Sequence, residues 1–111
     1  MLLLAKVERS EIIGFVCATT VTTIHSLTTK ALGSKEASHY IDLLISLFVI
    51  APVNRVVLER AIKSKFNDFE HAVIHESALI AGAQYIVTRN ITDFKRSQLP
   101  VFELSELIIH L

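Results

Sequence analysis

The sequence predicts a mixed α/β domain in which helices alternate with short apolar strands. The chain has 111 residues, of which 51% are hydrophobic and 20% charged, a composition that supplies a core and differs from that of disordered proteins. Short runs of consecutive apolar residues recur between segments of helical periodicity. Strands that are apolar on both faces are typical of parallel sheets covered by helices. We therefore expect one domain over 1–111, a three-layer α/β/α sandwich with a short, mostly parallel sheet.

The first half of the chain predicts two strands separated by a helical hairpin. The threonine-rich stretch after residue 18 suits a first helical turn, and Val21, Ile24 and Leu27 recur at helical spacing. Gly33 divides two helices, because glycine commonly follows a helix end. The elements expected are a short helix ending near Ser10, a strand over 12–17, helices over 19–31 and 34–47, and a strand over 48–51. The inward face expected for the second of these helices carries Ala37, Ile41, Leu44, Ile45 and Phe48.

The second half predicts a helix pair followed by two further strands. Asn54 and Asp68 are placed as N-caps, and Gly82 is placed to end the second helix. Tyr85 lies in a strand-favouring run, and Pro100 suits an edge strand. The elements expected are a helix after Asn54, a helix over 69–81, a strand over 83–88, a loop over 89–93, an edge strand over 99–102 and a closing helix from Ser105.

Charge and cysteine content restrict the class of protein. Eleven basic and eleven acidic residues cancel, so any positive surface for nucleic acid must be local. Cys17 is the only cysteine in the sequence, which excludes an intrachain disulfide and favours a reducing, cytoplasmic setting. The apolar runs at MLLLA and over 41–53 are too short to serve as a signal sequence or a membrane span.

Three stretches of the chain resemble PIN domains. The segment 66–94, FNDFEHAVIHESALIAGAQYIVTRNITDF, is similar to the C-terminal half of these domains, and YIVTRNITDF is its most specific part. The upstream GFVCATTVTTI and the trailing LPVFELSEL resemble the second and last strands with their following helices. The resemblance implies a PIN-like α/β/α fold and hydrolysis of RNA with Mg²⁺ or Mn²⁺, for which carboxylate oxygens are the preferred ligands. It also implies a possible antitoxin protein as partner, as in VapC-type toxin–antitoxin pairs.

The chain departs from the family pattern at its start and in its acidic residues. Nothing in MLLLAKVERS matches the strand ending in aspartate with which PIN domains begin, so that strand is expected to be absent, by natural truncation or by a misassigned start. His71 and Asn90 stand at positions that are commonly acidic in the family, whereas Asp93 is retained. Because the absent strand is central in the family's sheet, its neighbours would be left unpaired. We therefore expect a homodimer, a higher oligomer or a partner chain that fills the gap.

The resemblance and the local chemistry define a set of candidate site residues. The candidate catalytic residues are Asp93, Asp68 and Glu70. The candidate metal ligands are Asp93, Asp68 and His71. Substrate binding is assigned to Thr88, Arg89, Asn90, Lys95 and Arg96, since basic and polar groups beside a carboxylate suit a phosphate backbone. Asp68, His71 and His75 also share one helix face by their spacing, which would favour zinc, nickel or manganese over magnesium.

Each of these residues also has a purely structural interpretation. Asp68 suits a helix N-cap, and Glu70 suits the positive end of the helix dipole. His71 and His75 suit hydrogen-bonded helix positions, and Asp93 suits a turn. The function alternative to a metal-dependent ribonuclease is therefore an inactive PIN remnant that binds RNA or serves as a protein-interaction or oligomerisation module.

Overall fold

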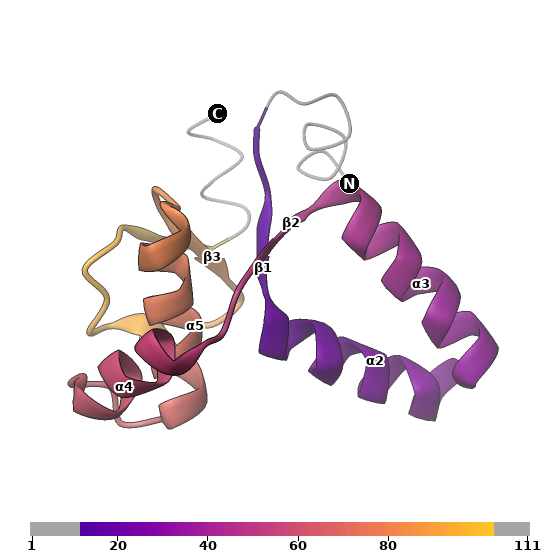
Figure 1. The fold of residues 1–111 in the computed structure, drawn as a ribbon, viewed down its shortest axis with the longest axis horizontal. Coiled ribbons are helices and arrows are strands. Elements are labelled where there is room, and N and C mark those ends of the chain that lie inside the picture. Colours follow the sequence, from indigo (N-terminus) through magenta and orange to yellow (C-terminus); the bar gives the residue numbers. More distant parts are fainter. Residues whose placement is uncertain (1–11, 104–111) are drawn as a thin grey trace. The chain divides into compact units, whose positions relative to one another are not determined.

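The computed structural model describes residues 12–103, and the chain divides into two compact units, Met1–Ala51 and Pro52–Leu111. The helices and short parallel strands of the two units are drawn in Figure 1. The predicted helices before Ser10 and after Ser105 lie outside the described residues. The predicted class, a mixed α/β chain with short parallel strands as in a PIN-like fold, is confirmed. The expectation of one domain over 1–111 stays a prediction.

The first unit consists of a parallel strand pair and a helical hairpin. Its elements are β1 (Phe15–Cys17), α2 (Ala18–Leu32), α3 (Ser34–Leu47) and β2 (Val49–Ala51). Phe15 lies opposite Val49 in the β1–β2 ladder. The threonines of α2 fit a helix because their hydroxyls donate to carbonyls of the preceding turn, as Thr22 does to Thr19 O at 2.7 Å. Gly33, with φ of 94°, takes the left-handed backbone that separates α2 from α3.

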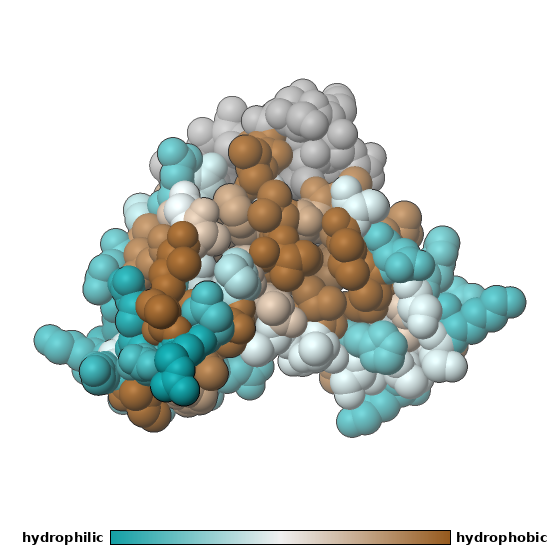
Figure 2. Space-filling model, in the orientation of Figure 1, coloured by the Kyte–Doolittle hydropathy of each residue, from teal (hydrophilic) through white to brown (hydrophobic). Residues whose placement is uncertain are grey.

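The hairpin of the first unit leaves most of its large apolar side chains in contact with solvent. Of the inward face predicted for α3 only Ala37 is buried, whereas Ile45 is 51% exposed, so that part of the prediction is wrong. Figure 2 shows hydrophobic side chains gathered alongside α3. We call the exposed apolar residues of α2 and α3 the hairpin surface; its members are Leu27, Leu32, Tyr40, Leu43 and Ile45.

The second unit consists of two helices and a second parallel strand pair. Its elements are α4 (Arg55–Lys63), α5 (Phe69–Ala81), β3 (Ile86–Thr88), the 3₁₀ helix η1 (Ile91–Phe94) and β4 (Val101–Glu103). The predicted caps are confirmed. Asn54 Oδ1 accepts the N–H of Val57 at 3.1 Å, and Asp68 Oδ1 accepts that of His71 at 3.2 Å. Gly82 ends α5 in the left-handed conformation, with φ of 84°.

Both strand pairs are shorter than the sequence predicts. The β3–β4 ladder joins Ile86 to Val101 in parallel register, and both strands begin later than predicted. The predicted loop over 89–93 contains most of η1. None of the helices within 12–103 is long and apolar enough to cross a membrane.

The core of the second unit combines small apolar side chains with three consecutive polar ones on α5. The buried apolar side chains are Val57, Ala61, Ala72, Val73, Ile86 and Phe94. His75, Glu76 and Ser77 are also buried, and Ser77 Oγ donates to Pro52 O at 3.0 Å. Within the described residues every buried side-chain nitrogen or oxygen has a hydrogen-bond partner, as a stable core requires.

Adjacent valines on α4 test this account of the core. Val57 is 0% exposed and Val56 is 54% exposed, although both lie in the same helical turn. Val57→Ala removes buried methyl groups and leaves a cavity, so we expect the free energy of unfolding to fall by about 2 kcal/mol. Val56→Ala should change it by less than about 0.5 kcal/mol. Urea unfolding of the two variants measures both values, and equal losses would contradict the packing described.

Candidate functional site

Three of the predicted site residues meet where α5 begins. Asp68 caps α5, His71 follows in its first turn, and Asp93 belongs to η1. His71 Nδ1 lies 3.8 Å from Asp68 Oδ1, and its Nε2 lies 3.7 Å from Asp93 Oδ2. Their side chains are 29%, 56% and 38% exposed, in the order His71, Asp68, Asp93. Since these distances exceed hydrogen-bond length and the groups are solvated, the pairs contribute little to stability. The two carboxylates are therefore accessible to a ligand.

A hollow of about 210 Å³ opens between the start of α5 and η1. We call it the α5–η1 hollow; its lining residues are Phe66, Asn67, Asp68, Thr92, Asp93, Lys95 and Arg96. Two carboxylates and two basic side chains thus line the same depression. The carboxylates suit a cation, and the basic side chains suit an anion. A phosphate whose oxygens also bind a cation would match both kinds of group.

Local hydrogen bonds explain how Asp93 reaches the hollow. Asn90 Oδ1 accepts the N–H of Thr92 at 3.1 Å and so starts η1. The N–H of Asn90 in turn donates to Thr88 Oγ1 at 3.2 Å. Phe94 is buried, and its ring centroid lies 5.3 Å from that of His71 and 6.0 Å from that of Phe66. Thr88, Asn90 and Phe94 thereby hold the turn that carries Asp93.

The structure separates the candidate residues into two groups. Asp68, Asp93, Lys95 and Arg96 line the hollow. The lining set does not include Glu70, an exposed residue in the first turn of α5. Nor does it include His71, which lies between the two carboxylates. Thr88, Arg89 and Asn90, which immediately precede η1, are also outside the lining.

The hollow offers a divalent cation two carboxylates rather than a complete protein cage. No group of three or more His, Cys, Asp or Glu side chains within the described part of the chain is arranged to hold a metal ion. One oxygen of Asp68 already accepts a backbone N–H, and His71 stands between the carboxylates with a different ring nitrogen toward each. Mg²⁺ is commonly held by one or two carboxylates together with substrate phosphate oxygens. Two carboxylates suit that shared arrangement by their chemistry, and the described residues form no all-protein metal site.

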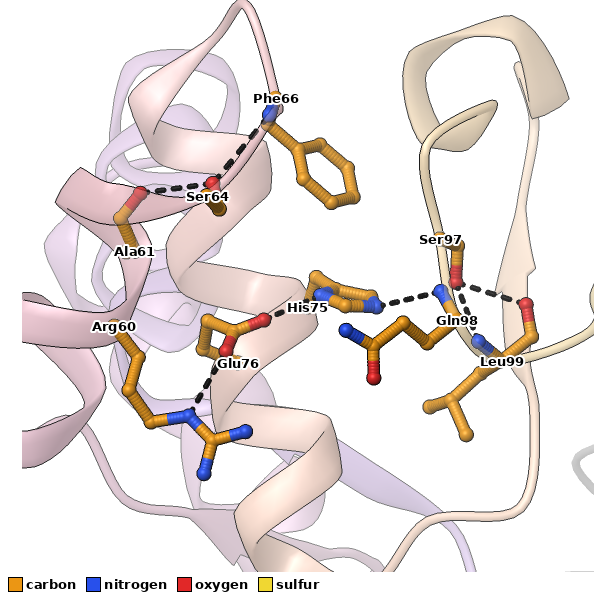
Figure 3. Close-up of polar contacts among 9 residues, drawn as sticks. All are labelled: Arg60, Ala61, Ser64, Phe66, His75, Glu76, Ser97, Gln98 and Leu99. Carbon is orange, nitrogen blue, oxygen red and sulfur yellow. Dashed lines mark hydrogen bonds and ion pairs between the residues drawn. The ribbon is translucent and has the colours of Figure 1, made fainter.

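His75 does not belong to this site, so the prediction that it joins Asp68 and His71 as a metal ligand is wrong. His75 is 2% exposed, and both of its ring nitrogens have hydrogen-bond partners. Nδ1 lies 2.6 Å from Glu76 Oε2, and Nε2 accepts the N–H of Gln98 at 3.0 Å (Figure 3). The sequence analysis missed Glu76 as the partner of His75. The signal available was a His-Glu pair inside the otherwise apolar run AVIHESALIA.

Comparison with protein families assigns the chain. A family model described as a PIN domain matches residues 1–92. The chain belongs to the PIN domain family. This match includes α5 and β3 and ends one residue before Asp93. PIN domains have a nuclease-type fold and commonly use Mg²⁺ or Mn²⁺. A search of curated proteins gave no significant match.

Two substitutions of Asp68 separate its capping role from any role of its charge. Asp68→Ala removes the acceptor for the His71 N–H, so we expect the free energy of unfolding to fall by about 1 kcal/mol. Asp68→Asn keeps an equally good cap while removing the negative charge, and stability should be nearly unchanged. Thermal or urea unfolding distinguishes them. A loss as large for asparagine as for alanine would show that the carboxylate charge, rather than the cap, stabilises α5.

Proposed function

We propose that this chain is a PIN-type ribonuclease whose α5–η1 hollow receives a phosphate of RNA. The observation that supports the proposal is that Asp68 and Asp93, from separate elements, line the same hollow as Lys95 and Arg96. Carboxylates alone repel a phosphate, and basic side chains alone do not recruit a cation. Their combination in one depression suits both at once.

The roles proposed for the lining residues follow from their charges. Asp68 and Asp93 would hold Mg²⁺ or Mn²⁺ jointly with the phosphate oxygens, and Lys95 and Arg96 would contact the backbone phosphates. When bound, such a cation supplies charge neutralisation at the phosphate and a water that is more acidic than bulk water.

The residues beside the hollow receive secondary roles in this proposal. Glu70 lies in the first turn of α5, outside the lining of the hollow, and its carboxylate would accept a hydrogen bond from water beside the hollow. Thr88, Arg89 and Asn90 lead into η1 and would contact the RNA strand next to the hollow. An antitoxin partner stays a prediction that rests on the family resemblance, and a cytoplasmic setting stays one that rests on the single cysteine of the sequence.

Cleavage of a mixed-sequence RNA tests the proposal. We expect cleavage in Mg²⁺ or Mn²⁺ and none in EDTA, because two carboxylates cannot compensate the phosphate charge by themselves. Asp93→Asn should reduce cleavage to the EDTA level, and gel analysis of the products measures it. Asp68→Asn should do the same without loss of the helix cap. Cleavage that survives both substitutions would place the chemistry elsewhere or reveal a contaminant.

RNA binding in the presence of Ca²⁺ tests the basic side chains separately. Single-stranded nucleic acid gives a slope of log K against log salt of about −0.7 per phosphate contact. Removing both contacts by Lys95→Ala with Arg96→Ala should therefore make the slope less negative by about 1.4. The matched control is Lys30→Ala with Lys35→Ala, which removes two exposed lysines from the hairpin of the first unit. Equal effects of the two pairs on the slope would contradict a specific phosphate contact at the hollow.

Self-association is a second function, and the hairpin surface supports it. Leu27 on α2 is 61% exposed, and Leu43 on α3 is 46% exposed. None of the other large side chains of these two helices is fully buried. Apolar exposure of this kind commonly marks an interface. The zero net charge of the chain removes long-range repulsion between copies. We propose a homodimer that buries the hairpin surface, and this role does not depend on catalysis.

Light scattering at micromolar concentration tests the dimer. The wild-type chain should have twice the monomer mass, and Leu27→Asp with Leu43→Asp should shift it toward the monomer, because charges would be buried without partners. The control is Ile62→Asp, which adds a charge at a side chain 71% exposed on α4. A monomeric wild type, or equal dissociation by the control, would contradict the hairpin surface as the interface.

A further inference from the structure

A buried polar cluster joins three segments of the second unit. Arg60 Nε, from α4, donates to Glu76 Oε1 at 3.0 Å, and Glu76 Oε2 lies 2.6 Å from His75 Nδ1 (Figure 3). Gln98, in the segment before β4, donates its backbone N–H to His75 Nε2 at 3.0 Å. His75 and Glu76 are 2% and 5% exposed. The imidazole of His75 is thus the link between the Arg60–Glu76 pair and the segment that follows η1.

The hydrogen bonds determine the tautomer of His75. A ring nitrogen accepts a hydrogen bond only when it carries no proton, so Nε2 is unprotonated. The neutral ring then carries its proton on Nδ1, which donates to Glu76 Oε2. Glu76 accepts from His75 and from Arg60, as an ionised carboxylate does. The cluster therefore has one consistent set of donors and acceptors. Arg60 donates to Glu76, Gln98 donates to His75, and His75 donates to Glu76.

The bond to Gln98 anchors one end of a short segment whose other end carries the basic residues of the hollow. Lys95 and Arg96 line the hollow, and Gln98 follows two residues after Arg96. Between them Ser97 Oγ donates to Leu99 O at 2.8 Å and accepts the N–H of Leu99 at 2.9 Å. These local bonds shape the turn, whereas the bond to His75 fixes the turn against α5.

We propose that His75 is a positioning residue that, as the Nδ1–H tautomer, places Lys95 and Arg96 at the hollow by holding the backbone of Gln98. The effect on RNA rests on the proposed function, whereas the tautomer and the anchoring of Gln98 do not. His75 has no contact with the hollow's lining carboxylates in this role; it acts through the chain path of residues 95–98.

NMR of the ¹⁵N-labelled full chain tests the tautomer directly. The two ring nitrogens of His75 should give separate signals, with the proton on Nδ1 and an unprotonated Nε2. A proton on Nε2 would overturn the proposal, because Nε2 could then no longer accept the hydrogen bond from the N–H of Gln98. This measurement uses the wild-type protein and depends on neither cleavage nor RNA binding.

Two isosteric substitutions separate positioning from simple stabilisation. His75→Gln places an acceptor near the position of Nε2 and loses the donor to Glu76. His75→Asn places an N–H near the position of Nδ1 and loses the acceptor for Gln98. We expect the amide of Gln98 to exchange about tenfold faster in the asparagine variant than in the glutamine variant. Thermal midpoints serve as the control for general destabilisation, and equal exchange at Gln98 in two folded variants would overturn the proposal.

RNA binding supplies the readout that a merely structural role would not change. At a salt concentration where wild type binds, His75→Asn should weaken binding and make the salt dependence less steep, as removal of Lys95 and Arg96 does, whereas His75→Gln should not. Weakening to the same extent in both variants would overturn positioning through Gln98. If the wild-type chain binds no RNA, the proposed function fails, and the tautomer and exchange measurements still decide the role of His75.

Discussion

The second unit depends on the requirement that His75 and Glu76 find hydrogen-bond partners inside an otherwise apolar helix. A buried polar group without a partner costs about 1–3 kcal/mol, and a charged one costs more. Arg60 and the backbone of Gln98 meet this requirement, so α4 and the segment before β4 pack against α5 in the one arrangement that completes the cluster. Apolar contacts alone are less directional and would permit sliding. The polar pair therefore specifies the packing more than it adds to stability.

The candidate site is built on the same helix and shares an aromatic residue with the cluster. The ring centroid of Phe66 lies 4.9 Å from that of His75 and 6.0 Å from that of Phe94, and Phe66 also lines the hollow. Asp68 stands at the start of α5, where the helix dipole favours a negative charge, and Asp93 follows Ile91 and Thr92 on η1. The accessible carboxylates are thus carried by rigid elements, whereas Lys95 and Arg96 are carried by a turn that needs the anchor at Gln98.

Local signals in the sequence predicted the helices and part of the site. They did not predict contacts between residues that lie far apart in the sequence. Asn54, Asp68 and Gly82 mark helix ends because their capping bonds involve residues a few positions away. The PIN resemblance pointed to Asp93, and the basic residues were found by their position beside Asp93 in the sequence. The bond between His75 and Gln98 joins positions 23 apart, which no periodicity reveals. The exposure of Ile45 was missed for a related reason, because an apolar helix face looks the same in sequence whether its own chain or another covers it.

The most direct test of the account is to locate Mn²⁺ by its paramagnetic broadening of backbone amide signals in the presence of a short RNA. If Asp68 and Asp93 hold a cation together with phosphate oxygens, the amides of residues 67–71 and 92–96 should broaden first. The same experiment without RNA should give weaker broadening at the same residues, because the hollow alone supplies only two carboxylates. Broadening centred on other residues would contradict the assignment of the site.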